Sequence, residues 1–206
     1  MEYLLSYTAT SLSIVETEMM ANLFLETKDW QKVEERVLGE NLLQKTSQAA
    51  QKREFREIRL RLQNLTDEEL RFFTEANSDE IRLLCMLAAV KSYRLIKEFL
   101  IEVMRNKLLL FDYQILHSDY AAFYDSKKAD DERLETLSES TQKKLQQVMY
   151  RMFAESGLID STKNKMILRP YLSEALIETI VHDDPKLLAA FLYANNDIEA
   201  YTKKYA

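Results

Sequence analysis

Apolar residues recur at helical spacing along almost the whole chain, and capping residues mark the points where helices begin. Ser13 with Glu16, and Thr66 with Glu69, form capping-box patterns ahead of apolar segments. Ser47 is a candidate N-cap because a long amphipathic segment follows it. The same signals predict helices over residues 15–25, 30–38, 48–64, 67–76, 79–107 with a break near Ser92, 118–128, 141–155, 174–182 and 185–194.

One part of the chain departs from this helical pattern. Leu158-Ile159 and residues 166–168 are short apolar runs on either side of a polar turn, and Gly157 precedes them. A winged helix typically has this order: a helix with a glycine C-cap, a short strand, a basic tip and a return strand. In a winged helix that binds DNA, the helix enters the major groove. A structural hairpin without a nucleic-acid role is the alternative.

Composition favours an all-α fold. The 206 residues include two glycines and two prolines, fewer than the hairpins and tight turns of a many-stranded protein require. The charged segment between Lys127 and Ser138 is the weakest join in the chain. We therefore predict a helical N-terminal bundle over residues 1–128, with its basic helix at 47–64, followed by a small winged-helix-like C-terminal unit with one short β-hairpin over residues 129–206.

The single cysteine and the N-terminal sequence indicate a cytoplasmic protein. Cys85 lies in an apolar run and has no second cysteine to pair with, which fits a reducing compartment. Residues 1–13 contain no lysine, no arginine and no long apolar stretch, so they do not resemble a signal peptide. No apolar run approaches the roughly 20 residues of a membrane span, and we expect no contact with a membrane.

Positive charge is concentrated in separate blocks, although the formal net charge is −6. Residues 45–63 contain six bases and two acids, and residues 141–171 contain the same numbers. A locally basic surface can therefore form on an acidic protein. A third block, residues 91–107, interleaves its bases with apolar residues, so we interpret it mainly as the solvent-facing side of a core helix.

The first basic block has an amphipathic order. At about 100° per residue, Phe55, Ile58, Leu62 and Leu65 fall on one stripe, which we expect to be buried. The bases fall on the neighbouring face, and Lys45 lies beside the N-terminal N–H groups of the helix, which can hold a phosphate. A solvated basic face without a ligand is the alternative. The candidate DNA-binding residues of this block are Lys45, Ser47, Lys52, Arg53, Arg56 and Arg59.

The second basic block repeats this arrangement. Five apolar residues between Leu145 and Phe153 form a packing stripe, whereas Tyr150 falls with the polar residues of the opposite face. Gln147 can reach a base edge, and the lysines of the following turn can touch the flanking phosphates. The candidate DNA-binding residues of this block are Lys143, Lys144, Gln147, Arg151, Lys163, Lys165 and Arg169.

Motifs that carry catalysis are missing from the sequence. His117 and His182 are far apart along the chain, and Cys85 has the surroundings of a small buried side chain. Two glycines cannot form a phosphate-binding loop or a nucleophile elbow, and no Cys/His spacing is typical of a metal site. We therefore predict no enzymatic activity, no cofactor, no metal and no small-molecule substrate.

Several segments carry a family resemblance through their order and spacing. They are residues 3–25, Asp29-Trp30, residues 40–47 with Arg53 and residues 59–62, and residues 138–145 with 154–159. Together they resemble the BrxA family of bacterial BREX phage-defence systems, over residues 3–176. The resemblance implies a small, non-catalytic, all-helical protein that binds double-stranded DNA, acts beside other BREX subunits, and is similar to helical antitermination factors of the NusB type.

These observations predict a non-enzymatic accessory protein that grips duplex DNA through basic helix faces with little sequence preference. One alternative is a protein-interaction adaptor of the same defence complex, whose basic faces meet an acidic partner. Another alternative is an RNA-binding factor, although few exposed aromatic residues are expected to stack on single-stranded bases.

Overall fold

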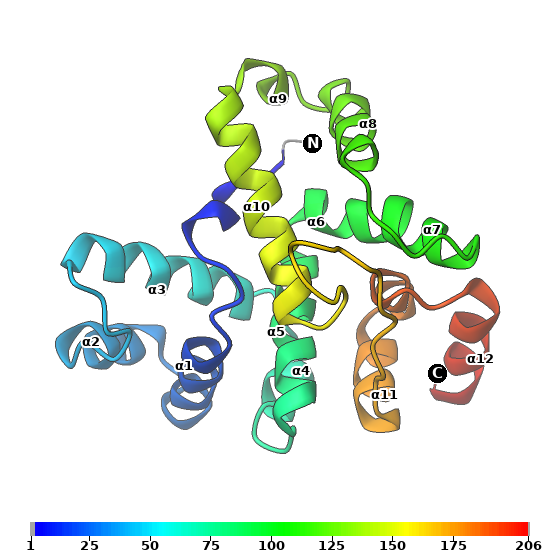
Figure 1. Cartoon of the computed structure of the whole chain (residues 1–206). Helices are drawn as coiled ribbons and strands as arrows, with labels where there is room; N and C mark the ends of the chain where they lie inside the picture. Colours follow the sequence, from blue (N-terminus) through cyan, green and yellow to red (C-terminus); the bar gives the residue numbers. More distant parts are fainter. Residues whose placement is uncertain (1–2, 206) are drawn as a thin grey trace.

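The computed structural model describes residues 3–205, and these fold into helices joined by short connections (Figure 1). The α-helices of the first half are α1 (Ile14–Thr27), α2 (Trp30–Gly39), α3 (Gln48–Leu62), α4 (Asp67–Phe72), α5 (Ser78–Ser92) and α6 (Arg94–Glu98). Those of the second half are α7 (Asn106–Leu109), α8 (His117–Lys128), α9 (Arg133–Thr136), α10 (Glu139–Glu155), α11 (Glu174–Asp183) and α12 (Asn195–Tyr205). Two 3-10 helices, η1 (Ser6–Ala9) and η3 (Pro185–Phe191), and a π-helical segment between α6 and α7, η2 (Phe99–Arg105), complete the fold.

Several helix starts predicted from the sequence are confirmed. The Ser47 hydroxyl accepts a hydrogen bond from the backbone N–H of Ala50 at 3.2 Å, at the start of α3. Thr66 and Glu69 form the expected reciprocal capping box ahead of α4. The helix break near Ser92 is also confirmed, because α5 ends at that residue. Local side-chain chemistry therefore sets these boundaries.

Other predicted helix starts are wrong. Ser13 precedes α1 but forms no capping box, because its φ is 48° and its hydroxyl donates to Glu54 of α3 instead. The start of α5 is capped by Asn77, so this helix begins at Ser78, one residue before the predicted start at 79. The start of α10 is capped by Ser138, whose hydroxyl accepts from the N–H of Thr141 at 3.3 Å, so this helix begins at Glu139 rather than at the predicted 141.

The predicted all-α class is confirmed, whereas the winged-helix unit and its β-hairpin are not. Residues 3–205 contain no β-strand and only two isolated antiparallel bridges, Gln114 with Met166 and Ile159 with Ile167. The antiparallel pairing of Ile159 with Ile167 does not extend toward the turn, because the Asp160 carboxylate accepts the N–H of Met166 and Lys165 adopts a left-handed φ of 56°. The turn after α10 is therefore a loop held by side chains and by the segment before α8.

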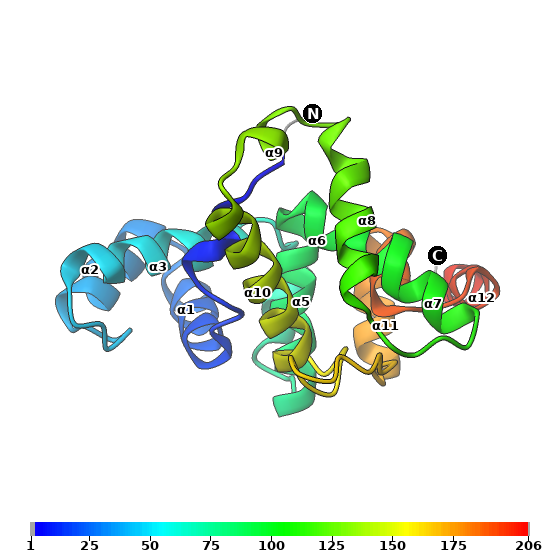
Figure 2. The same ribbon diagram turned by 45° about the horizontal axis from the view of Figure 1, so that its top comes forward.

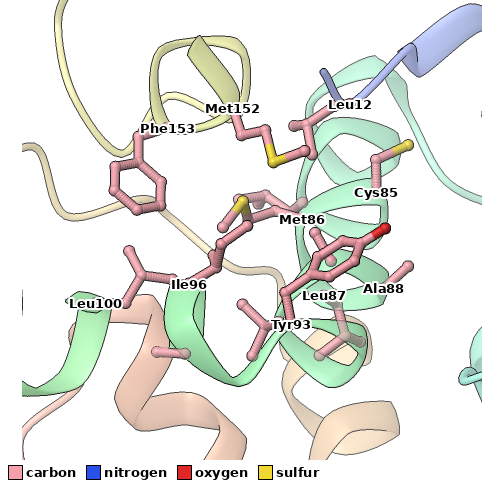
Figure 3. Close-up of a cluster of buried hydrophobic side chains, with 14 of the residues drawn as sticks. Leu12, Cys85, Met86, Leu87, Ala88, Tyr93, Ile96, Leu100, Met152 and Phe153 are labelled. Atoms are coloured by element: carbon pink, nitrogen blue, oxygen red, sulfur yellow. The ribbon is translucent and has the colours of Figure 1, made fainter. Parts of the chain in front are cut away.

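α5 forms the centre of the hydrophobic core. Nine of its fifteen residues are buried, which places apolar side chains on every side of the helix. It packs against α1, α3, α6, α10 and η3. Figure 3 shows Cys85, Met86 and Leu87 of α5 in this cluster with Met152 and Phe153 of α10. The expectation that Cys85 is a core residue is confirmed.

The apolar stripes predicted on the two basic helices are buried. Phe55, Ile58 and Leu62 of α3 are each at most 1% exposed, and the stripe of α10 is buried in the same way. Tyr150 of α10 is an exception to the predicted face. It is buried rather than solvent-facing, because its ring packs against the rings of Phe99 in η2 and Tyr120 in α8.

Buried residues on both sides of position 128 belong to one hydrophobic cluster. Leu12 from the N-terminal segment, for example, lies in it together with Met152 (Figure 3). The division of the chain into two units at residue 128 stays a prediction. Over residues 3–205, no helix combines the length and apolar character needed to cross a bilayer.

Candidate nucleic-acid interface

The N-terminal segment from Tyr3 to Ser13, called the strap below, is held against α3 by buried polar side chains. The Ser6 hydroxyl donates to the Glu57 carboxylate at 2.9 Å. The Arg61 guanidinium donates to the carbonyl oxygens of Thr10, at 2.9 Å, and Ser11. Because these polar groups are buried and matched to one another, they fix the course of a segment that has little helical structure of its own.

α10 holds the strap from the other side. The Glu155 carboxylate accepts the backbone N–H of Leu12 at 2.9 Å. Figures 1 and 2 both show α10 with α3 on one of its sides and α8 on the other, and η1 of the strap packs against both α3 and α10. The strap therefore forms the floor between two helices that are about ninety positions apart in the sequence.

A groove of about 450 Å³ opens above this floor. α3 and the loop before it form one wall, and α10 forms the other. The residues that line it are Thr8, Ala9, Thr10, Ser11, Ser13, Glu16, Lys45, Ala50, Arg53, Glu54, Lys144, Val148 and Arg151. The two basic blocks of the sequence therefore meet in one place.

The charges in the groove are unequally matched. Lys45 is paired with Glu54 at 2.7 Å, and that carboxylate is almost fully buried. Across residues 3–205, no carboxylate oxygen lies within 4.0 Å of the charged nitrogens of Arg53, Lys144 or Arg151. The lining carries four cations, Lys45, Arg53, Lys144 and Arg151, against two carboxylates, Glu16 and Glu54, and this excess of two positive charges suits an anion. The groove is thus equipped to hold a negatively charged group.

Five predicted residues lie near the groove without lining it. Lys52 and Arg56 are exposed on α3 and Gln147 is exposed on α10, whereas Lys143 lines a separate pocket between α8 and α10 and pairs with Glu139 at 3.9 Å. Gln147 follows Lys144 by three positions and precedes Arg151 by four, so all three share one face of α10. Ser47 uses its hydroxyl to cap α3. These side chains extend a polar, mostly basic surface outward from both walls.

The remaining predicted residues are engaged elsewhere or lie outside the groove. Arg59 pairs with Glu34 at 3.7 Å and stacks over the ring of Trp30. The loop after α10 carries the other three, Lys163, Lys165 and Arg169, and none of them lines the groove. Lys165 lies over the Tyr150 ring, and Arg169 pairs with Asp197 at 2.8 Å.

The hydroxyl residues of the strap were not among the predicted site residues. Thr8 and Ser11 line the groove beside the cations, and no side-chain hydrogen bond within residues 3–205 engages either hydroxyl. The strap has no helical periodicity, so its position depends entirely on contacts with α3 and α10. A cluster of four hydroxyl residues among positions 8–13 is the one sequence signal that points to it.

The bases of the third block are held in ion pairs and hydrogen bonds, and the side chains of Lys91 and Lys107 are largely covered rather than solvent-facing as the sequence pattern predicts. Lys91 pairs with Glu69 and with Asp183 at 3.0 Å, and Lys107 pairs with Asp112 at 2.6 Å. Arg94 and Arg105 are likewise bound to neighbouring groups. Paired cations of this kind contribute little free potential to the surface, in contrast to those of the groove.

No arrangement typical of catalysis stands out among the described residues. Within positions 3–205, no group of three or more His, Cys, Asp or Glu side chains is close enough to hold a metal ion. His117 begins α8 and His182 lies in the last turn of α11, where it bonds to Glu68 at 2.9 Å. Burial raises the pKa of the Cys85 thiol to about 12, so this sulfur stays protonated and inert at neutral pH.

An exposed apolar patch lies at a different part of the surface. It consists of Leu109 at the end of α7, of Leu110, Phe111, Tyr113 and Leu116 from the segment between α7 and α8, and of Met166 and Leu168 from the loop after α10. The bridge between Gln114 and Met166 brings the two segments together. Leu110 and Phe111 are 78% and 79% exposed, which is unusual for side chains of this size.

Comparisons with known proteins give a consistent result. The family model described as BrxA matches residues 1–184. A protein named BREX protein BrxA from Escherichia coli O9:H4 (strain HS) is 26% identical over 82% of this chain and 81% of its own. A protein of the same name from Bacillus cereus (strain H3081.97) is 26% identical over 72% of this chain and 74% of its own.

A solved structure shares the fold. The crystal structure of an uncharacterized protein from Magnetospirillum magneticum superposes with a TM-score of 0.81. The match covers 92% of this chain and 97% of that chain at 20% sequence identity. The helical arrangement described above therefore recurs in a protein whose sequence has diverged widely.

Proposed function

Because this chain belongs to the BrxA family, we propose that it is a non-enzymatic accessory protein of a BREX phage-defence system and that it binds double-stranded DNA. The observation that supports DNA binding best is the groove. Arg53, Lys144 and Arg151 converge there from two helices without acidic partners. A cytoplasmic location, where bacterial DNA lies, is part of the proposal.

The lining of the groove favours the backbone of a duplex over a single strand. Its described lining residues include hydroxyl, aliphatic and charged side chains but no aromatic ring. Single-strand binding relies on aromatic platforms that stack on bases. Hydroxyl and cationic groups instead bind phosphate oxygens, which carry no direct sequence information. Little sequence preference follows from this chemistry.

The exposed basic residues around the groove extend the proposed contact. In this proposal Lys52 and Arg56 on α3 and Gln147 on α10 contact phosphates on either side of the one held in the groove, and Lys143, on the side of α10 that faces α8, supplies an outer contact. Lys163 and Lys165 supply outer contacts in the same proposal. If about five phosphates are neutralised, the logarithm of the binding constant falls against the logarithm of salt concentration with a slope of about −4.5.

Charge reversal tests this function. The double variant Arg53→Glu/Lys144→Glu should lose at least about tenfold in affinity for a duplex of random sequence, and its salt slope should shrink in magnitude by about two. Fluorescence anisotropy over a series of salt concentrations measures both quantities. The matched control is Lys32→Glu/Lys186→Glu, which reverses two exposed lysines outside the groove. Equal loss in both doubles, or a salt-independent affinity in the wild type, refutes DNA binding through the groove.

A protein-docking role is the second candidate function, and the exposed apolar patch favours it. Large contiguous apolar patches on a protein surface mark interaction sites. Phe111 occupies the position just after the end of α7 with a left-handed φ of 60°, where glycine is the usual residue. Lys107 holds the base of this loop through Asp112 and Asp119. Because the chain belongs to a BREX family, the partner proposed for this patch is another BREX subunit.

Co-expression with the other subunits of the system tests the docking role. The variant Leu110→Ser/Phe111→Ser should lose a subunit that co-purifies with the wild type. Val15→Ser is the control, since Val15 is an exposed apolar residue that is not part of the patch. Unchanged co-purification of every subunit contradicts the docking role. Sedimentation of the isolated chain shows whether the patch binds a second copy instead.

A further inference from the structure

Arg61 is a buried cation beneath the floor of the groove. Its side chain is among the largest that are fully buried, at 1% exposure. The Nε atom donates to the Tyr93 hydroxyl at 2.9 Å, and that hydroxyl donates in turn to the Glu57 carboxylate. The two terminal nitrogens donate to the carbonyl oxygens of Thr10 and Ser11. A charge in this position is tolerated because each of the three guanidinium nitrogens donates a hydrogen bond.

The two carbonyl contacts fix the direction of the backbone N–H groups of the strap. A trans peptide is planar, so its N–H points opposite its C=O. The Ser11 carbonyl faces Arg61, and the N–H of the same peptide, that of Leu12, donates to Glu155 of α10 at 2.9 Å. The Thr10 carbonyl also faces Arg61, so the N–H of Ser11 must likewise point toward the side of α10.

The N–H of Ser11 is therefore directed away from Arg61, and Ser11 itself lines the groove. It takes part in no hydrogen bond with any group of the described chain. The hydroxyls of Thr10 and Ser13 are in use, because they donate to Glu54 at 3.0 and 2.9 Å. Those of Thr8 and Ser11 remain available. The floor thus offers uncharged donors directly beside the unpaired cations on the walls.

We propose that Thr8 and Ser11 bind a non-bridging phosphate oxygen of the DNA backbone and that Arg61 is the positioning residue that turns the strap toward it. This rests on the proposed function and adds the uncharged part of the same site. Hydroxyl and backbone N–H donors fix the register of a phosphate without adding charge. Arg61 itself does not touch the DNA, because the strap covers it.

Salt dependence separates these donors from the cations. The variant Thr8→Val/Ser11→Ala should bind a random duplex about tenfold more weakly, with an unchanged salt slope, since uncharged donors displace no counterions. Arg53→Gln should instead lose affinity and reduce the magnitude of the slope by about one. Ser118→Ala is the control, because Ser118 is an exposed hydroxyl residue of α8 that does not line the groove. It should keep wild-type affinity.

The possible outcomes distinguish this inference from the proposed function. If Thr8→Val/Ser11→Ala binds like the wild type while Arg53→Glu/Lys144→Glu fails to bind, the strap donors are refuted and DNA binding stands. If neither variant changes the affinity, both proposals fail. Inorganic phosphate added at constant ionic strength should not displace the duplex. If inorganic phosphate displaced the duplex, Thr8 and Ser11 would form a site for a free anion, and the proposal would be overturned.

The positioning role of Arg61 needs a control for stability. Arg61→Lys keeps the charge but cannot reach two carbonyl groups at once. It should bind the duplex about tenfold more weakly at a temperature where circular dichroism shows it folded, with the wild-type salt slope. Phe55→Leu, a core variant on the same helix, should retain wild-type affinity at the same fraction of folded protein. If Arg61→Lys and Phe55→Leu bind the duplex with equal affinity, Arg61 has only a structural role.

Discussion

The backbone N–H of Leu12 donates to the Glu155 carboxylate of α10 at 2.9 Å, across a separation of 143 residues. This hydrogen bond joins the strap to the end of the helix that carries Lys144 and Arg151. The position of the groove floor relative to this wall is therefore set by the hydrogen bond to Glu155 together with the packing of η1 against α10 and α3.

Glu155→Ala should lower the free energy of unfolding by about 1.5 kcal/mol, the usual contribution of a hydrogen bond to a charged group. Urea denaturation followed by circular dichroism measures it. Glu155→Gln keeps an acceptor oxygen and should cost less than half as much. Equal destabilisation by the two substitutions would show that the negative charge, rather than the hydrogen bond to Leu12, holds the strap.

Glu54→Gln should strengthen DNA binding several-fold. The carboxylate of Glu54 lies in the groove and holds Lys45 at 2.7 Å, so its removal takes away a negative charge and frees that lysine for a phosphate. One more neutralised phosphate steepens the salt slope by about 0.9. The same variant should be about 1 kcal/mol less stable, because Thr10 and Ser13 lose their charged acceptor. Weaker binding with normal folding would contradict the charge argument.

The stability of the protein should depend on His182 near neutral pH. The hydrogen bond to Glu68 raises the pKa of His182 above its ordinary value of 6.5, since it favours the protonated ring. Because the folded-state pKa is the higher one, this stabilisation is fully present below pH 6.5 and is lost as pH rises through the folded-state pKa. Unfolding free energies measured from mildly acidic to mildly alkaline pH should decline in the wild type. Glu68→Gln should flatten that part of the profile.

Cys85 should be unreactive in the folded protein. Desolvation in the core raises the pKa of its thiol to about 12, and the thiolate is the reactive species. A thiol reagent at slightly alkaline pH should modify Cys85 only in unfolded chains. Denaturant should accelerate the reaction in proportion to the unfolded fraction. Rapid labelling without denaturant would show that this part of α5 opens locally.

Much of the secondary structure could be predicted because it depends on neighbours in the sequence. Ser47 caps α3 through a hydrogen bond to a residue three positions later, and Phe55 and Ile58 share a face because of helical periodicity. The same logic failed at Ser13, where Glu54, forty-one positions away, takes the hydroxyl that would otherwise cap α1. It also failed at Tyr150, whose ring is covered by the side chains of η2 and α8.

The sequence by itself determined that this chain is helical, that α3 and α10 each have a buried stripe beside a basic face, and that it resembles the BrxA family. Those properties follow from composition and from contacts within one or two helical turns. Only the tertiary structure decided which cations are unpaired, that Arg53 and Lys144 line one groove, and that the strap forms its floor. These depend on hydrogen bonds and packing between residues far apart along the chain, whose partners no local pattern specifies.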